Sequence, residues 1–148
     1  MRKLYQLIAF SLLTVGCATG SEDTAGHTAD IAGVWVFQSE PYNLNCIMAG
    51  QLQLAPTGAP DDFEGVLLTV ERCPAGSVNA RELATEQEVR AQRSGNRLRI
   101  DSTIVQVSPA NTVYFEDNFR LRIIDGSLMQ GYQLGPTGFG VEFWRPEE

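Results

Sequence analysis

Residues 119–132 read FRLRIIDGSLMQGY, and this stretch decides the fold class. Its centre, Asp125-Gly126, is typical of a two-residue turn between antiparallel strands. Pairing outward from that turn sets Ile123 opposite Leu128, Leu121 opposite Gln130, and Phe119 opposite Tyr132. These six side chains would share one face of a hairpin, with Arg120, Arg122 and Met129 on the other. The stretch therefore predicts a β-hairpin whose inner face is mostly apolar but includes Gln130 and Tyr132.

The chain on either side has the same character, with short β-prone runs separated by turns. Strands are expected within 31–37, 51–54, 63–72, 97–100 and 139–143, with Leu52 and Leu54 inward and Val66, Leu68 and Val70 on one face. Turns are expected at 55–62 (APTGAPDD) and 135–138 (GPTG). This spacing indicates an antiparallel barrel or sandwich, and we expect a mainly β fold, a single up-and-down β-barrel of about eight strands.

Residues 79–93 are compatible with two structures. Asn79 followed by Glu82 resembles a helix capping box, and the residue types favour helix. However, Leu83, Thr85, Gln87, Val89 and Ala91 alternate with charged and polar residues, which is the period of a strand. A Ser94-Gly95-Asn96 turn follows. We expect a strand from about Thr85 to Gln92.

The N-terminus has the layout of a secretory signal. Arg2 and Lys3 precede an apolar run over residues 4–15, too short for a membrane-spanning helix, which needs about 20 residues. Gly16-Cys17 closes the run and resembles the lipobox of bacterial lipoproteins, although an ordinary signal peptide cut near Ala18 is the alternative. The resemblance implies a signal peptide (1–16), a lipidated Cys17 with a flexible tether (17–30), and a barrel domain (31–148). It also implies a cell-envelope location on the outer membrane, on its periplasmic face or the cell surface.

Charge excludes some classes of partner. After removal of residues 1–16 the chain has nine arginines, no lysine and 18 acidic residues. Nucleic acid requires a basic footprint, so we expect no nucleic-acid partner. The same overall charge argues against docking on anionic lipid headgroups and leaves anchoring to the acyl chains.

Of the three cysteines, Cys46 and Cys73 remain once Cys17 is acylated. In an oxidising compartment these two are expected to form a disulfide, whose loop closure is worth about 3.5 kcal/mol. A metal site lacks ligands, because the only histidine, His27, lies in the tether. We expect no metal and no cofactor.

Gly33-Val34-Trp35 resembles the G-x-W motif that begins the first strand of lipocalins and related small barrels. In that family the tryptophan closes one barrel end and an arginine beyond the last strand packs across its ring. Arg145 stands in the matching place here. The resemblance implies an interior that binds a small apolar or amphipathic ligand, for which Trp35, Leu121, Gln130 and Tyr132 are the candidate residues.

Other polar groups have both a functional and an ordinary interpretation. Arg97 and Arg99 on one strand and Arg120 and Arg122 on another would form a patch that receives a carboxylate or acidic partner, or a solvated face paired with Glu86 and Glu88. The acids Asp61, Asp62, Glu64, Glu116 and Asp117 are expected in solvated turns. No catalytic motif is present, so we do not expect an enzyme.

Two functions follow. The first is a membrane-anchored barrel that binds a small ligand inside. The second is an envelope protein-interaction module, such as an assembly accessory or an inhibitor of a protease or lysozyme, with Gln38–Asn45 and Ala55–Asp62 as contact loops. A hollow interior favours the first function, and a solid core with exposed apolar loop tips favours the second.

Overall fold

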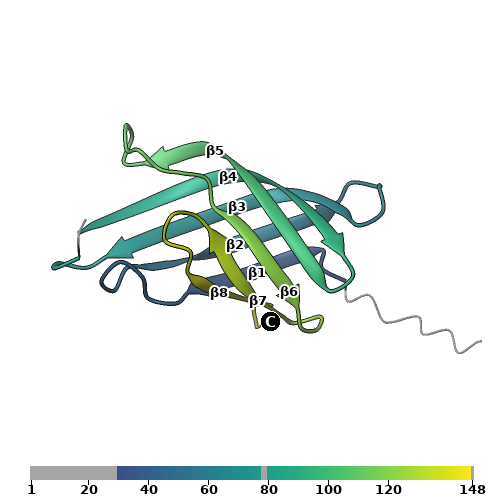
Figure 1. The fold of residues 1–148 in the computed structure, drawn as a ribbon. Coiled ribbons are helices and arrows are strands. Elements are labelled where there is room, and N and C mark those ends of the chain that lie inside the picture. The colour runs from purple at the N-terminus through teal and green to yellow at the C-terminus, as the bar shows by residue number, and fades with distance from the viewer. Residues whose placement is uncertain (1–29, 78–79, 148) are drawn as a thin grey trace, which may run out of the picture.

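The computed structural model describes residues 30–77 and 80–147, which form a closed antiparallel barrel of eight strands (Figure 1). Each strand pairs with the next, and β8 pairs with β1. The strands are β1 (Gly33–Ser39), β2 (Ile47–Pro56), β3 (Asp62–Cys73), β4 (Arg81–Ser94), β5 (Arg97–Ser108), β6 (Asn118–Ile123), β7 (Leu128–Leu134) and β8 (Gly140–Trp144). The predicted up-and-down barrel is confirmed.

The predicted signal peptide, Cys17 and tether lie outside the described residues. Within the described ranges, no helix is long and apolar enough to cross a membrane.

The barrel has two ends, and we name each one after the group that lies there. Odd-numbered strands begin at the Trp35 end and finish at the disulfide end.

Residues 81–94 form a strand, as the alternating pattern predicts and contrary to the helical propensity of these residue types. In β4 the residues Leu83, Thr85, Gln87, Val89 and Ala91 are buried, while the residues between them are exposed. β4 pairs along nearly its whole length with both β3 and β5. Two continuous ladders outweigh a helical preference worth a few tenths of a kcal/mol per residue.

The predicted pairing of residues 119–132 is wrong by one residue. Ile123 lies opposite Met129, and Leu121 lies opposite Gly131. The turn has three residues, because Ile124 N–H donates to the Leu128 carbonyl (3.0 Å) and leaves Asp125 to Ser127 as the loop. A shift of one residue moves every side chain of β7 to the opposite face. Met129 is therefore inside the barrel, whereas Gln130 and Tyr132 are outside.

In β3 the buried residues are Leu67, Thr69, Glu71 and Cys73. The face shared by Val66, Leu68 and Val70 is therefore the outer one, and Val66 and Leu68 are exposed. Leu52 and Leu54 of β2 are buried as predicted.

Aromatic side chains fill the middle of the barrel. Phe37 stacks on Phe143 with 4.8 Å between ring centroids, and Phe119 meets both rings edge to face. Gly50 makes room for this packing, because a Cβ there would lie 2.8 Å from a Phe37 ring atom and 1.9 Å from the Leu68 carbonyl oxygen. Leucine, isoleucine and methionine side chains complete a continuous buried cluster. The centre of the barrel is thus a packed core.

Trp35 closes one end of the barrel, as the sequence predicts. Its indole N–H donates to the Ile31 carbonyl (2.9 Å), and the Arg145 guanidinium lies 4.0 Å from the ring centroid. Arg145 also donates to the carbonyls of Val34 (3.1 Å), Ala32 (2.7 Å) and Asp30 (2.9 Å). The arginine therefore joins the chain segment before β1 to the segment after β8.

The disulfide between Cys46 and Cys73 is present at the other end, where it links the start of β2 to the finish of β3. The loops Gln38–Asn45 and Ala55–Asp62 connect β1 to β2 and β2 to β3, so they lie at opposite ends of the barrel. The prediction that they form one contact surface is therefore wrong.

Candidate functional site

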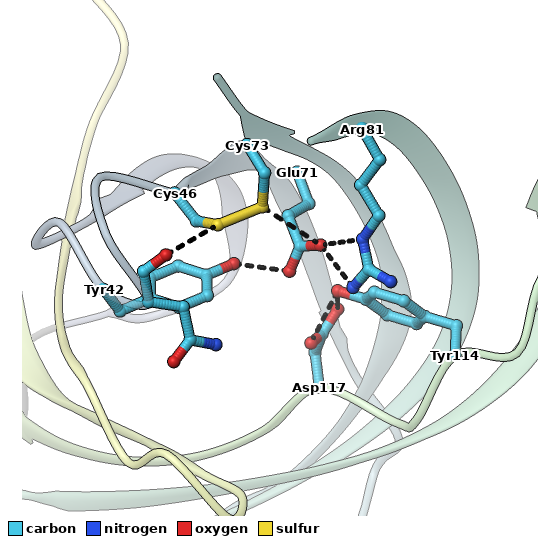
Figure 2. Close-up of polar contacts among 8 residues, drawn as sticks. Tyr42, Cys46, Glu71, Cys73, Arg81, Tyr114 and Asp117 are labelled. Atoms are coloured by element: carbon cyan, nitrogen blue, oxygen red, sulfur yellow. Dashed lines mark hydrogen bonds and ion pairs between the residues drawn. A yellow bond between two sulfur atoms is a disulfide. The ribbon is translucent and has the colours of Figure 1, made fainter. Parts of the chain in front are cut away.

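A group of polar side chains lies inside the disulfide end, and we call it the end cluster. Its members come from four parts of the chain: Tyr42 from the β1–β2 loop, Glu71 from β3, Arg81 and Gln87 from β4, and Tyr114 and Asp117 from the β5–β6 connection. Figure 2 shows most of these side chains pointing toward one another beside the disulfide. This is a place where charged and polar groups converge within an otherwise apolar interior.

Glu71 is the centre of one half of the end cluster. Its carboxylate accepts a hydrogen bond from the Tyr42 hydroxyl (2.6 Å). It also forms an ion pair with Arg81, whose Nε and Nη2 lie 2.7 Å and 2.6 Å from Glu71 Oε1 (Figure 2). Burial and the hydrogen bond to Glu71 raise the pKa of Tyr42, so the phenol remains a donor. A buried carboxylate needs this kind of compensation, and Glu71 has it from both sides.

Asp117 is the centre of the other half and is only 1 % exposed. Its carboxylate accepts from Gln87 Nε2 (2.6 Å) and from the Tyr114 hydroxyl (3.1 Å to each oxygen). Gln87 Oε1 in turn accepts from the Asp117 amide (3.0 Å) and from the Ser102 hydroxyl (2.6 Å). Burial raises the pKa of Asp117 to about 6. The expectation that Asp117 lies in a solvated turn is wrong, because the turn folds back into the barrel.

The end cluster is chemically self-contained. Each carboxylate has its donors within the cluster, and burial together with the Asp117 charge raises the pKa of Tyr114 and keeps that phenol protonated. In the described part of the chain, no group of three histidine, cysteine or acidic side chains is placed to hold a metal ion. The arrangement ties the β5–β6 connection to the barrel wall and closes the disulfide end.

The ligand residues predicted from the sequence do not meet inside the barrel. Trp35 is buried beneath Arg145, and Leu121 is buried in the apolar core. Gln130 and Tyr132 face outward, and Tyr132 is 53 % exposed. However, Leu121, Gln130 and Tyr132 all border one hollow of about 1070 Å³ on the outer wall.

The predicted arginine patch does form, and it borders the same hollow. Arg97 lies directly opposite Arg122, and Arg99 lies directly opposite Arg120. The predicted alternative of a solvated outer face is also confirmed, because three of the four arginines are exposed, but its pairing with Glu86 and Glu88 is wrong. Asp101 is the carboxylate that pairs with Arg99 (2.5 Å) and, more distantly, with Arg120 (3.8 Å). We call the four arginines together with Gln130 and Tyr132 the arginine groove.

Comparison with known proteins supports the fold alone. No family model and no curated protein matches the chain. Three solved structures are similar, and each match covers 78 % of this chain. They are a redesigned β-barrel (14 % identity, 91 % of that chain, TM-score 0.52), a barrel solved bound to DFHBI (13 %, 93 %, 0.51) and a de novo designed fluorescence-activating barrel (15 %, 93 %, 0.50).

Proposed function

We propose that this chain is a membrane-anchored lipoprotein of the bacterial cell envelope, that it is not an enzyme, and that its barrel binds another envelope protein. The observation that carries the proposal is the combination of a packed barrel centre with exposed apolar side chains at the disulfide end. Phe37, Phe119 and Phe143 occupy the space in which a ligand would sit. Binding inside the barrel, the first function predicted, stays a prediction with less support.

Three of the exposed apolar residues belong to the second half of β5 and the connection that follows it. Val105, Val113 and Phe115 are 56 %, 78 % and 72 % exposed. Leu44, at the tip of the β1–β2 loop, belongs to the same end and is 64 % exposed. Large apolar side chains gathered in this way are typical of protein-binding surfaces.

The β5 backbone adds a second recognition element. β6 pairs with β5 only over Arg97–Ile100, whereas β4 pairs with β5 as far as Ser108. The segment 103–108 (TIVQVS) is uncharged, and on its side away from β4 no described strand pairs with it. An extended segment of a partner protein would add to this edge as a strand and place its apolar side chains against Phe115.

Site-specific photocrosslinking in the native envelope tests this proposal. A photoreactive residue at Phe115 should yield a discrete adduct with one envelope protein, and the Val105→Lys variant should abolish that adduct by placing a charge at the edge. The matched control is the same photoreactive residue at Leu68, which is exposed on the outer face of β3. Equal adducts at both positions, or none at Phe115, would overturn the proposal.

Native mass spectrometry of the same chain, purified from its own membrane, tests the alternative. A reproducible extra mass that disappears on unfolding would show cargo inside the barrel. The anchor itself is tested by the mass of Cys17, because acylation adds a diacylglycerol to its thiol and a cleavage near Ala18 removes the cysteine altogether.

A further inference from the structure

The arginine groove contains an arrangement that barrel stability does not explain. Arg97 faces Arg122 and Arg99 faces Arg120 across neighbouring strands. Like charges directly opposite each other in an antiparallel pair are destabilising. The chain as a whole has a net charge of −7, so acidic residues were available to separate these arginines. The cluster is therefore better explained by a ligand than by the fold.

The charges of the groove are only partly neutralised by the protein. Asp101 forms an ion pair with Arg99 and a longer one with Arg120. Among the described residues, Arg97 and Arg122 form no ion pair. The Gln130 amide, next to Arg122, donates instead to Glu142 (2.6 Å). Two guanidinium groups thus retain their full complement of free donors.

The surrounding surface completes a site for an anion. The hollow of about 1070 Å³ lies over β5, β6 and β7 and is bordered at the β4–β5 turn by Ser94 and Asn96. Tyr132 borders its other side and lies opposite Arg120. Serine, asparagine, tyrosine and arginine side chains all offer hydrogen-bond donors to a bound anion.

We propose that the arginine groove binds a phosphate-bearing ligand, either a free phosphate ester or diphosphate or the phosphate of a lipid headgroup. A single carboxylate is satisfied by one guanidinium fork. A phosphate monoester has three terminal oxygens and close to two negative charges, so it can engage arginines from β5 and β6 together. A phosphate bound in the groove also offsets the repulsion between the two arginines of each opposed pair.

The groove lies near the Trp35 end, because β5 begins at Arg97 and β6 finishes at Ile123. The described chain also begins at this end, with Asp30 beside Arg145. If the proposed lipid anchor precedes Asp30, the tether joins the barrel at the end where the groove lies, so the groove can reach headgroup phosphates. The overall negative charge of the chain argues against such docking, but the local charge of the arginine groove is positive.

Calorimetric titration with pyrophosphate at low ionic strength tests the site. The chain from Ala18 onward is used, so that neither the apolar run at 4–15 nor acyl chains on Cys17 can bring it to membranes. We expect saturable binding that weakens by at least about tenfold for each arginine replaced in Arg97→Gln/Arg122→Gln. The matched control, Arg72→Gln/Arg90→Gln, loses the same charge elsewhere on the wall and should bind as the parent does. Because the first variant removes repulsion, its melting temperature should be unchanged or higher, which separates lost binding from lost folding.

Sedimentation with vesicles distinguishes the two sources. Binding to phosphatidic acid in phosphatidylcholine, but not to phosphatidylcholine alone, assigns the phosphate to a lipid headgroup if the Arg97→Gln/Arg122→Gln variant loses it. Binding of pyrophosphate without vesicle binding assigns it to a free phosphate compound. The proposal is overturned if succinate binds as tightly as pyrophosphate, if both double variants bind equally, or if neither pyrophosphate nor vesicles bind. None of these results depends on the protein partner proposed above.

Discussion

The buried carboxyl of Asp117 makes the barrel's stability depend on pH in a direction opposite to that of most acidic residues. Burial raises its pKa from 3.8 to about 6, so the folded chain binds a proton more tightly than the unfolded chain. Between these two values the unfolded state holds fewer protons, and stability falls as pH rises. The contribution is fully present below about pH 4 and is lost as pH passes about 6.

The size of this effect follows from the shift. One pKa unit corresponds to about 1.4 kcal/mol, so a shift of about two units is worth about 3 kcal/mol. Replacing Asp117 with Asn keeps an oxygen that accepts from Gln87 or Tyr114 and removes the charge. The free energy of unfolding of Asp117→Asn, relative to the parent chain, should therefore increase by about 3 kcal/mol between pH 4 and pH 7.

Urea denaturation of both chains across this pH range measures the difference directly. Other carboxyl groups titrate in both chains and cancel in the comparison. Glu88→Gln, which removes an exposed carboxylate from the outer face of β4, is the matched control and should show a flat difference. A flat difference for Asp117→Asn as well would refute the reasoning, because it would mean that Asp117 keeps an ordinary pKa in the folded barrel.

Two further substitutions and reduction of the disulfide test the ends and the wall of the barrel. Arg145→Gln should lower the free energy of unfolding by about 3 kcal/mol, through lost carbonyl hydrogen bonds and the lost contact with Trp35, in urea titrations. Reducing the bond between Cys46 and Cys73 should cost about 3.5 kcal/mol, and an unchanged urea midpoint with reductant would contradict this. Gly131→Ala should cost about 2 kcal/mol or more in thermal melts, because its Cβ would lie 2.0 Å from a β6 carbonyl oxygen.

The β-barrel and the faces of β4 could be predicted because strand periodicity is a local property. Thr85, Gln87 and Val89 alternate with charged residues, and the structure buries all three. The closure of the Trp35 end was also predictable, although its two partners are far apart in sequence, because a family resemblance supplied the pairing with Arg145.

The end cluster could not be predicted, because its contacts are not local. Gln87 and Asp117 are 30 residues apart, and Tyr42 and Glu71 are 29 apart. A signal was nevertheless present in β4, where Gln87 falls on the apolar face and a buried amide requires partners. In β3 the face that contains Val66 and Leu68 is apolar although it lies outside, so the pattern of this strand gave no indication that Glu71 is buried.

One side-chain interaction decides which groups meet on the outer wall. Asp125 Oδ1 accepts from the amides of Ser127 (2.7 Å) and Leu128 (3.0 Å), which favours a three-residue turn over the two-residue turn that Asp-Gly alone predicts. With a two-residue turn, Gln130 and Tyr132 would enter the apolar core and leave buried polar groups to satisfy. With three residues they stand beside the opposed arginines, and Met129 fills the core instead. The same extra residue therefore completes the packing of the interior and assembles the arginine groove outside it. This explains why Gln130 and Tyr132, which the sequence predicts to face the interior, lie on the outer side of the barrel wall.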